Sequence, residues 1–262
     1  MMKKILILIL FLLPWTVAGQ TPLPTTVIYR EGDAYCREKC RLLISAPTDD
    51  ARHPVIVWFH GGGLTGGKAK LPETLCKSGH LVISVGYRLV PNVSVAEIID
   101  DAAAAVAWVY ANAAKYGGDT TRVFLAGHSA GGYLVSMLGL DKKYLARYGL
   151  DADRLAAVVP YSGQSITHFA ERKAHGIDAL TPTIDDLAPM AHLRADAPPI
   201  FVISGDREKE MNGRYEENAY FVRMLRLNGH PDVRFVELGG FSHGAMAEPA
   251  HYLLLQYIRE RQ

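Results

Sequence analysis

Short apolar runs of strand length recur along the chain, and patterns of helical period separate most of them. Two of these runs, VIVWF and RVFLA, are almost continuously apolar, which is typical of strands buried on both faces of a sheet. We predict strands at 27–29, 41–45, 55–59, 81–87, 122–126, 156–161, 199–204 and 233–238. We predict helices at 96–116, 130–140, 215–227 and 249–259. This alternation predicts an α/β fold, with a mostly parallel central sheet of about eight strands and helices on both faces.

Two parts of the pattern depart from simple alternation. The first two or three predicted strands have no predicted helix between them, which indicates an antiparallel start to the sheet. The segment at about 162–198 lies between two predicted strands, carries charge and several prolines, and is longer than a simple crossover requires. We expect it to form a small, partly helical insertion over one end of the sheet.

The first 19 residues have the pattern of a secretory signal peptide. Lys3 and Lys4 precede the apolar run 5–13, and small or modest residues come before Gln20. The run is too short to cross a bilayer as a stable anchor, and the alternative is a buried N-terminal helix. We therefore expect a periplasmic or secreted protein, whose mature part, 20–262, is a single domain without a membrane anchor.

Composition narrows the range of partners. The chain has 262 residues, 49% of them hydrophobic, and a formal net charge of +1, so its charge does not favour nucleic acid or an anionic membrane. The three cysteines, Cys36, Cys40 and Cys76, have no zinc-site spacing, and we predict neither a metal nor a cofactor. Export permits a disulfide between Cys36 and Cys40, and the sequence leaves that question open.

A candidate nucleophile lies in the segment AGHSAGG. It contains the motif G-x-S-x-G as Gly127, Ser129 and Gly131, between a predicted strand and a predicted helix. In that setting the serine occupies a sharp turn that exposes its hydroxyl, and small residues on either side avoid backbone clashes. The alternative is a serine N-cap with glycines that serve packing. The partner residues later in the chain favour the nucleophile.

A serine hydroxyl needs a base, and in this setting the acid and then the histidine follow the serine in the chain. Of the later histidines, His243 lies in a glycine-flanked loop just after the last predicted strand. The acid is expected after the strand 199–204, where Asp206, Glu208 and Glu210 are the candidates. The alternative for Glu210 is a solvated charge.

The glycine-rich loop after the strand 55–59 has two interpretations. Gly62, Gly67 and Lys68 stand almost at the spacing of a phosphate-binding loop, but Ala69 occupies the position where such a loop needs Ser or Thr for magnesium. The loop suits an oxyanion hole better, because glycines let backbone N–H groups approach a developing negative charge. We assign this role to Gly61 and Gly62, with the N–H of Ala130 as the second contributor.

The order HGGG, GHSAGG, GDRE, FSHG resembles the serine esterases and lipases of the α/β-hydrolase fold that carry an HGGG loop. The segments VGYRLVP and DDAAAAVAWV resemble the same group, and GHSAGG is similar to bacterial carboxylesterases that remove acetyl or feruloyl groups from polysaccharides. The resemblance implies an acid three residues after Gly205, which favours Glu208, with Asp206 as the alternative. Glutamate there departs from the usual aspartate.

These observations predict an exported carboxylic-ester hydrolase that works through Ser129, His243 and a carboxylate. A peptidase or amidase of the same fold and a non-catalytic binding protein are the alternatives, and Ala69 argues against a nucleotide-binding protein. Tyr161, Ser162, His168 and Phe169 are expected to form a polar, partly aromatic rim. Such a rim favours short acyl groups on a small-molecule or oligosaccharide alcohol, including acetyl or feruloyl esters of carbohydrates.

Overall fold

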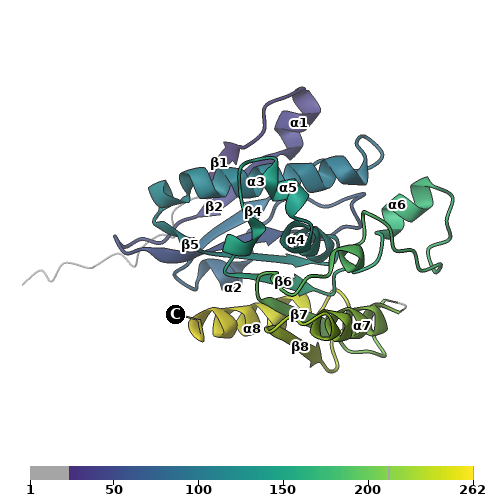
Figure 1. Ribbon diagram of the computed structural model, residues 1–262. Coiled ribbons are helices and arrows are strands. Elements are labelled where there is room, and N and C mark those ends of the chain that lie inside the picture. Colours follow the sequence, from purple (N-terminus) through teal and green to yellow (C-terminus); the bar gives the residue numbers. More distant parts are fainter. Residues whose placement is uncertain (1–23, 212, 262) are drawn as a thin grey trace, which may run out of the picture.

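The computed structural model of the chain describes residues 24–211 and 213–261 (Figure 1). Eight strands form one sheet in the order β1-β2-β4-β3-β5-β6-β7-β8, which confirms the predicted number. Their bounds are β1 Thr25–Ile28, β2 Arg41–Ser45, β3 His53–Phe59, β4 Leu81–Val85, β5 Gly118–His128, β6 Ala157–Tyr161, β7 Ile200–Gly205 and β8 Val233–Leu238. The predicted signal peptide, 1–19, lies outside the described residues.

The sheet begins antiparallel, as predicted. β1 pairs antiparallel with β2, and β2 pairs antiparallel with β4, whereas the other neighbouring strands are parallel. A short helix, α1 (Ala34–Lys39), stands between β1 and β2, so the expectation of no helix there was wrong. Asp33 caps this helix by accepting a hydrogen bond from the N–H of Cys36.

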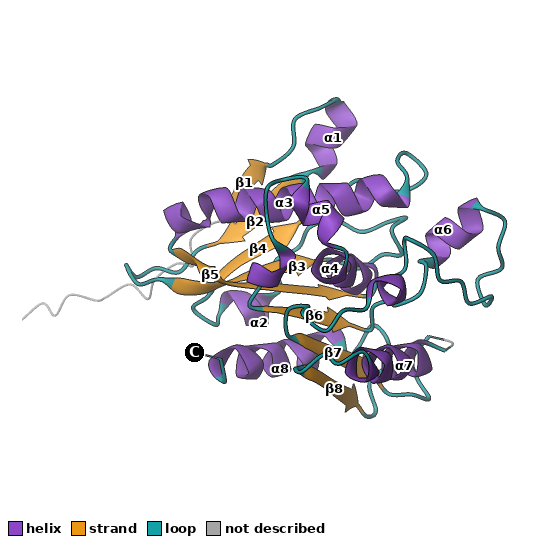
Figure 2. Cartoon of the chain, in the orientation of Figure 1, coloured by secondary structure: helices purple, strands orange, loops and turns teal. Residues whose placement is uncertain are grey.

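Helices cover both faces of the sheet, as Figure 2 shows. One face carries α3 (Val95–Asn112), α4 (Ala130–Leu140), α5 (Lys142–Ala146) and α7 (Arg214–Leu227), and the other carries α2 (Glu73–Cys76) and α8 (Ala247–Arg259). Strand β3 serves both layers because its side chains alternate: Val57 and Phe59 belong to one core and Ile56 and Trp58 to the other. Short 3₁₀ helices complete the described elements: η1 (Ala113–Tyr116), η2 (Ala152–Arg154) and η3 (Pro189–His192).

The segments VGYRLVP and DDAAAAVAWV meet through a buried ion pair. The Nε and Nη2 atoms of Arg88 each donate to the carboxylate of Asp101 over 2.8 Å, and the Asp101 side chain is fully buried. Helix α3, which carries Asp101, begins with a capping box formed by Ser94 and Glu97. The ion pair therefore fixes the loop after β4 to helix α3.

The segment between β6 and β7 holds α6 (Phe169–Ala174) and η3, and it extends beyond the sheet at the end where β6 finishes (Figure 1). The expectation that Tyr161, Ser162, His168 and Phe169 form a polar, partly aromatic rim was wrong for three of these residues. Tyr161, Ser162 and His168 are buried. The ring of Tyr161 packs on Trp58 in the core on the α2 and α8 side of the sheet, and the ring of His168 packs on Tyr133. Phe169 remains half-buried, against Gly63 of the glycine-rich loop.

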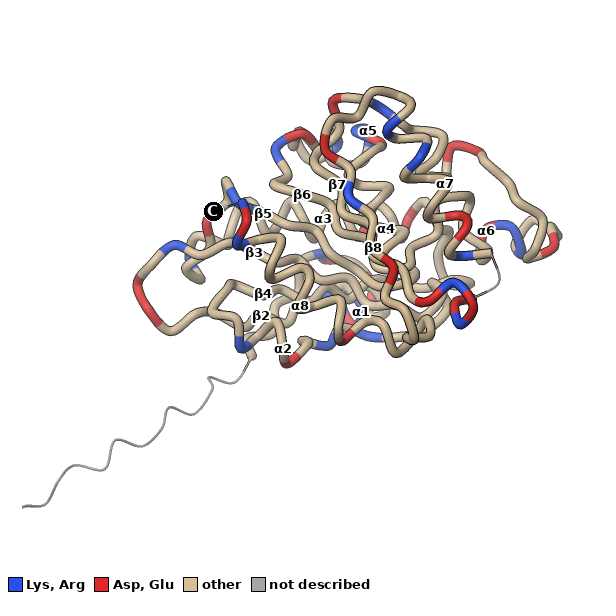
Figure 3. The backbone as a smooth tube through the Cα atoms, turned by 90° about the horizontal axis from the view of Figure 1, so that it is seen from below, with Lys and Arg blue, Asp and Glu red and all other residues tan. Residues whose placement is uncertain are grey.

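Acidic and basic residues alternate along the backbone rather than forming long stretches of one sign (Figure 3). Across residues 24–211 and 213–261, no helix combines the length and the apolar character needed to cross a membrane.

Candidate active site

Ser129 lies on a strained turn between β5 and α4. Its backbone has φ 55° and ψ −114°, which non-glycine residues rarely adopt, and its N–H donates to the carbonyl of Tyr161 over 2.8 Å. The two flanking glycines are required by contact: a Cβ on Gly127 would lie 2.5 Å from Gly131, and one on Gly131 would lie 2.1 Å from the carbonyl oxygen of Phe59. The turn therefore has the geometry that G-x-S-x-G predicted, with α4 starting directly after the serine.

His243 follows β8 and pairs with the carboxylate of Glu210. Its Nδ1 lies 2.7 Å from Oε2 of Glu210, in an ion-pairing geometry that joins the loop after β7 to the loop after β8. The Glu210 side chain is 1% exposed, and that of His243 is 18% exposed. Because Nδ1 is engaged with the acid, Nε2 is the ring nitrogen available to take up a proton.

Glu210 is held by several donors besides His243. Its Oε1 accepts from the hydroxyl of Ser162 and from the N–H of Gly205 over 3.0 Å, and its Oε2 accepts from the N–H of Met211. Burial raises the pKa of Glu210, but the hydrogen bonds from His243 and Ser162 outweigh burial and lower the pKa to about 2. The carboxylate is therefore ionised at neutral pH.

The predicted acids, Glu208 and Asp206, do not contact His243, and this part of the prediction was wrong. Glu208 is exposed, and its N–H donates to the Asp206 carboxylate over 2.9 Å. The same carboxylate accepts from the N–H of Gly240 over 2.5 Å and so ties the two loops together. Because the N–H of Glu210 bonds the carbonyl of Asp206, the loop folds back in one turn that directs Glu210, and not Glu208, toward His243.

His128, the residue before Ser129, supports His243 and was not predicted to do so. Its Nε2 donates to the carbonyl of His243 over 2.7 Å, and the two rings lie 4.8 Å apart between centroids. Burial, assisted by the neighbouring His243, lowers the pKa of His128 to about 4. The hydrogen bond from the neutral His128 therefore holds the loop of His243 next to the turn that carries Ser129.

The glycine-rich loop lies against the serine. A Cβ on Gly61 would be 3.4 Å from Cβ of Ser129 and 3.1 Å from the carbonyl oxygen of His128. Gly62 has φ 119°, and its carbonyl accepts from the N–H groups of residues 65 and 66, so it forms the turn of the loop. Ala130 is buried at the first position of α4, directly after Ser129. Gly61 and Ala130 thus flank Ser129, and Gly62 shapes the loop beside it.

The cysteines lie away from this site. Cys36 and Cys40 are buried free thiols with their sulfur atoms 3.8 Å apart, and Cys76 is a half-buried free thiol. Within the part of the chain that the structure describes, no group of three or more His, Cys, Asp or Glu side chains is arranged to hold a metal ion.

Comparisons with known proteins agree with this architecture. The chain is 32% identical to the esterase LipC of Mycobacterium tuberculosis over 205 residues, which are 71% of this chain and 50% of LipC. Among solved structures, a truncated carbohydrate esterase from gut microbiota superposes with a TM-score of 0.75 at 19% identity, covering 93% of this chain and 98% of that one. The structure of esterase 2 of Thermogutta terrifontis superposes with a TM-score of 0.73 at 22% identity, covering 92% of this chain and 94% of that one.

The chain spans about half the length of LipC, so the likeness to LipC concerns one part of that protein. The two structural likenesses show the fold. The sequence model of the BD-FAE family matches residues 43–216, which include the glycine-rich loop, Ser129 and Glu210. Because this match covers more than half of the chain, the protein belongs to the BD-FAE family and has the α/β-hydrolase fold.

Proposed function

We propose that this protein is a serine carboxylic-ester hydrolase. The single observation that carries the proposal is the buried Glu210–His243 pair, with its 2.7 Å contact, joined through His128 to the strained turn of Ser129. A binding protein would not need a buried carboxylate that orients an imidazole whose loop is bonded to the residue before a strained serine. The names of LipC and of the solved structures as esterases support the same reaction.

The arrangement performs the reaction in two halves. Ser129 attacks the acyl carbon while Nε2 of His243 takes the hydroxyl proton, and Glu210 stabilises the resulting imidazolium. N–H groups of Gly61 and Ala130 stabilise the oxyanion of the tetrahedral intermediate. His243 then protonates the departing alcohol, and water repeats the sequence on the acyl-enzyme, which releases the acid and regenerates Ser129.

Covalent labelling tests this proposal directly. A fluorophosphonate probe should modify the folded protein at Ser129, and the Ser129→Ala variant should not react. Hydrolysis of p-nitrophenyl acetate should disappear in the same variant. Folded wild-type protein that neither labels nor hydrolyses any ester would reject the proposal, and faster cleavage of aminoacyl amides than of esters would favour the amidase alternative.

We further propose short acyl groups on carbohydrate alcohols as the substrates. The likeness to a carbohydrate esterase of gut microbiota supports this class. A series of p-nitrophenyl esters should show higher kcat/KM for acetyl and butyryl than for chains of about ten carbons. Acetylated xylan and methyl ferulate then distinguish acetyl from feruloyl esters.

Export remains a proposal that rests on the sequence of residues 1–19. Expression of the full chain in a bacterial host, followed by fractionation and N-terminal sequencing, should place a processed protein outside the cytoplasm. An unprocessed cytoplasmic protein would contradict the proposal.

A further inference from the structure

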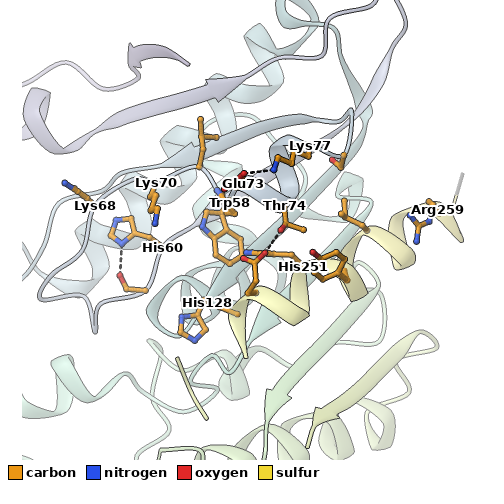
Figure 4. A pocket seen from close by; sticks show the side chains of 18 residues that line it. Trp58, His60, Lys68, Lys70, Glu73, Thr74, Lys77, His128, His251 and Arg259 are labelled. Atoms are coloured by element: carbon orange, nitrogen blue, oxygen red, sulfur yellow. Dashed lines mark hydrogen bonds and ion pairs between the residues drawn. The ribbon is translucent and has the colours of Figure 1, made fainter. Parts of the chain in front are cut away.

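A second feature adjoins the site on the face of the sheet that carries α2 and α8. There a groove of about 980 Å³ runs between the segment 68–78 and α8, with Trp58 of β3 at its floor (Figure 4). One end is lined by Gly61 and His128, and the other is lined by Arg259 at the end of α8. Gly61 packs against Ser129 and His128 precedes it, so this end of the groove is lined by two neighbours of the serine, while Ser129 itself is not among the lining residues.

The charge of this groove is positive. Four cationic side chains and two carboxylates line it. Lys77 pairs with Glu73 over 2.5 Å, and the carboxylate of Glu248 accepts a hydrogen bond from Thr74. The remaining cations are Lys68, Lys70 and Arg259, which are exposed and have no carboxylate within 4.0 Å among the described residues. They stand toward the two ends of the groove in Figure 4, with Lys68 and Lys70 near the catalytic end.

The walls between these cations mix apolar and polar groups. Tyr252 is 61% exposed, and Leu71, Pro72 and Leu255 add apolar surface beside it. The polar edge of the wall is formed by Thr74 and Glu248, whose side chains are hydrogen-bonded to each other. A sugar chain has the matching character, because a pyranose ring presents apolar C–H faces and polar hydroxyl edges, and aromatic rings suit such faces.

We propose that this groove binds the alcohol part of the substrate and that the alcohol is an acidic oligosaccharide, a sugar chain that carries a carboxylate. The position of the ester at the Gly61 end rests on the proposed ester hydrolysis. Lys68 and Lys70 then face a carboxylate on a sugar close to the ester, and Arg259 faces one several sugars away. Long-range attraction to the cations and direct pairing both favour such a chain over a neutral one.

The kinetic test compares acidic and neutral substrates. The wild type and the double variant Lys68→Gln/Lys70→Gln are assayed on acetylated xylo-oligosaccharides with and without one uronic acid, and on p-nitrophenyl acetate. Wild type should prefer the acidic oligosaccharide, and the double variant should lose on the order of 3- to 10-fold in kcat/KM on that substrate alone. The preference should weaken between about 20 mM and about 500 mM NaCl. The matched control Lys39→Gln/Lys115→Gln, which removes two cations outside the groove, should behave as wild type.

Equal kcat/KM for acidic and neutral oligosaccharides, or equal losses on both in the Lys68/Lys70 variant, would overturn the inference. A binding experiment separates it from the proposed reaction. Calorimetry with a deacetylated xylo-oligosaccharide that carries a uronic acid should show binding that weakens in Lys68→Gln/Lys70→Gln. Binding without hydrolysis of any ester would leave the groove assigned and the esterase rejected, and absence of binding would reject the groove.

Discussion

The carboxylate of Glu210 lies 2.7 Å from Nδ1 of His243, and these two residues come from loops that follow adjacent parallel strands, β7 and β8. The pair is protected from water on the side of the acid, because Glu210 is almost fully buried. Several donors fix its carboxylate, so the imidazole is oriented before any substrate arrives.

Single substitutions should show that Glu210, and neither Glu208 nor Asp206, is the acid that supports catalysis. We expect Glu210→Gln to lower kcat on p-nitrophenyl acetate on the order of 10³- to 10⁴-fold, because the amide cannot stabilise the imidazolium. Glu208→Gln is the matched control, two residues away and exposed, and should retain wild-type kcat. Asp206→Asn should mainly lower the urea concentration at the midpoint of unfolding, because its carboxylate ties two loops together. A loss of kcat in Glu208→Gln equal to that in Glu210→Gln would return Glu208 to the site.

Ser162 should act as a positioning residue for Glu210. Its hydroxyl donates to Oε1 of Glu210, so Ser162→Ala removes one of the hydrogen bonds that lower the pKa of that carboxyl. We expect the pKa of Glu210 to rise from about 2, and kcat to fall about 5- to 30-fold with little change in KM. A pH–kcat profile should show the loss growing toward acid pH. A uniform loss at every pH would indicate a general packing defect.

The glycine loop should be sensitive at one position and tolerant at another. Gly61→Ala places a methyl group 3.1 Å from the carbonyl oxygen of His128 and 3.4 Å from Cβ of Ser129, which displaces the N–H assigned to the oxyanion. We expect kcat to fall on the order of 10²-fold. Gly66→Ala in the same loop meets nothing closer than 3.8 Å and should leave kcat close to wild type. Equal effects of the two substitutions would argue against the oxyanion role.

Buried histidines should make the fold sensitive to acid. Burial lowers the pKa values of His80, His128 and His251 to about 4. Below about pH 6.5 these histidines bind protons in the unfolded chain but stay neutral in the folded chain. The free energy of unfolding should therefore fall as pH drops from about 6.5 to 4. Urea unfolding across this range measures the slope. His80→Gln should flatten it, whereas His175→Gln, which alters an exposed side chain, should not.

The ion pair of Arg88 and Asp101 should contribute to stability rather than to catalysis. Asp101→Asn leaves a largely buried guanidinium without its counter-charge, and we expect the free energy of unfolding to fall by about 2–4 kcal/mol. Asp100→Asn removes the partner of Arg30 in a more exposed ion pair, and it should lower the free energy of unfolding by less than Asp101→Asn does. Chemical denaturation measures both variants. A smaller loss for Asp101→Asn than for Asp100→Asn would contradict this account.

The sequence predicted the sheet, the principal helices, Ser129 and His243 because each depends on a local pattern: apolar runs, a glycine-flanked serine and a histidine after the last strand. It placed Glu210 among three candidate acids but favoured Glu208 over it. Counting from Gly205 assumes an open loop, whereas hydrogen bonds to the carbonyl of Asp206 close that loop into a turn. Which carboxylate reaches His243 depends on contacts between segments 33 residues apart. The predicted rim failed for the same reason, because the buried Ser162 is bonded to two segments distant in the sequence: its hydroxyl donates to Glu210 and its N–H donates to the carbonyl of Ile203.

Strand β8 lies at the edge of the sheet, pairs with β7 alone among the described strands, and is partly exposed along its length. The serine and the glycine loop, by contrast, follow central strands that are buried on both sides. His243, the proposed base, is therefore attached to an edge strand, which local unfolding reaches more easily than the central strands that precede the glycine loop and Ser129. Fraying of this edge would withdraw His243 from an otherwise intact fold, so we expect the lifetime of the competent site to depend on the pairing of β7 with β8 more than on the stability of the whole domain.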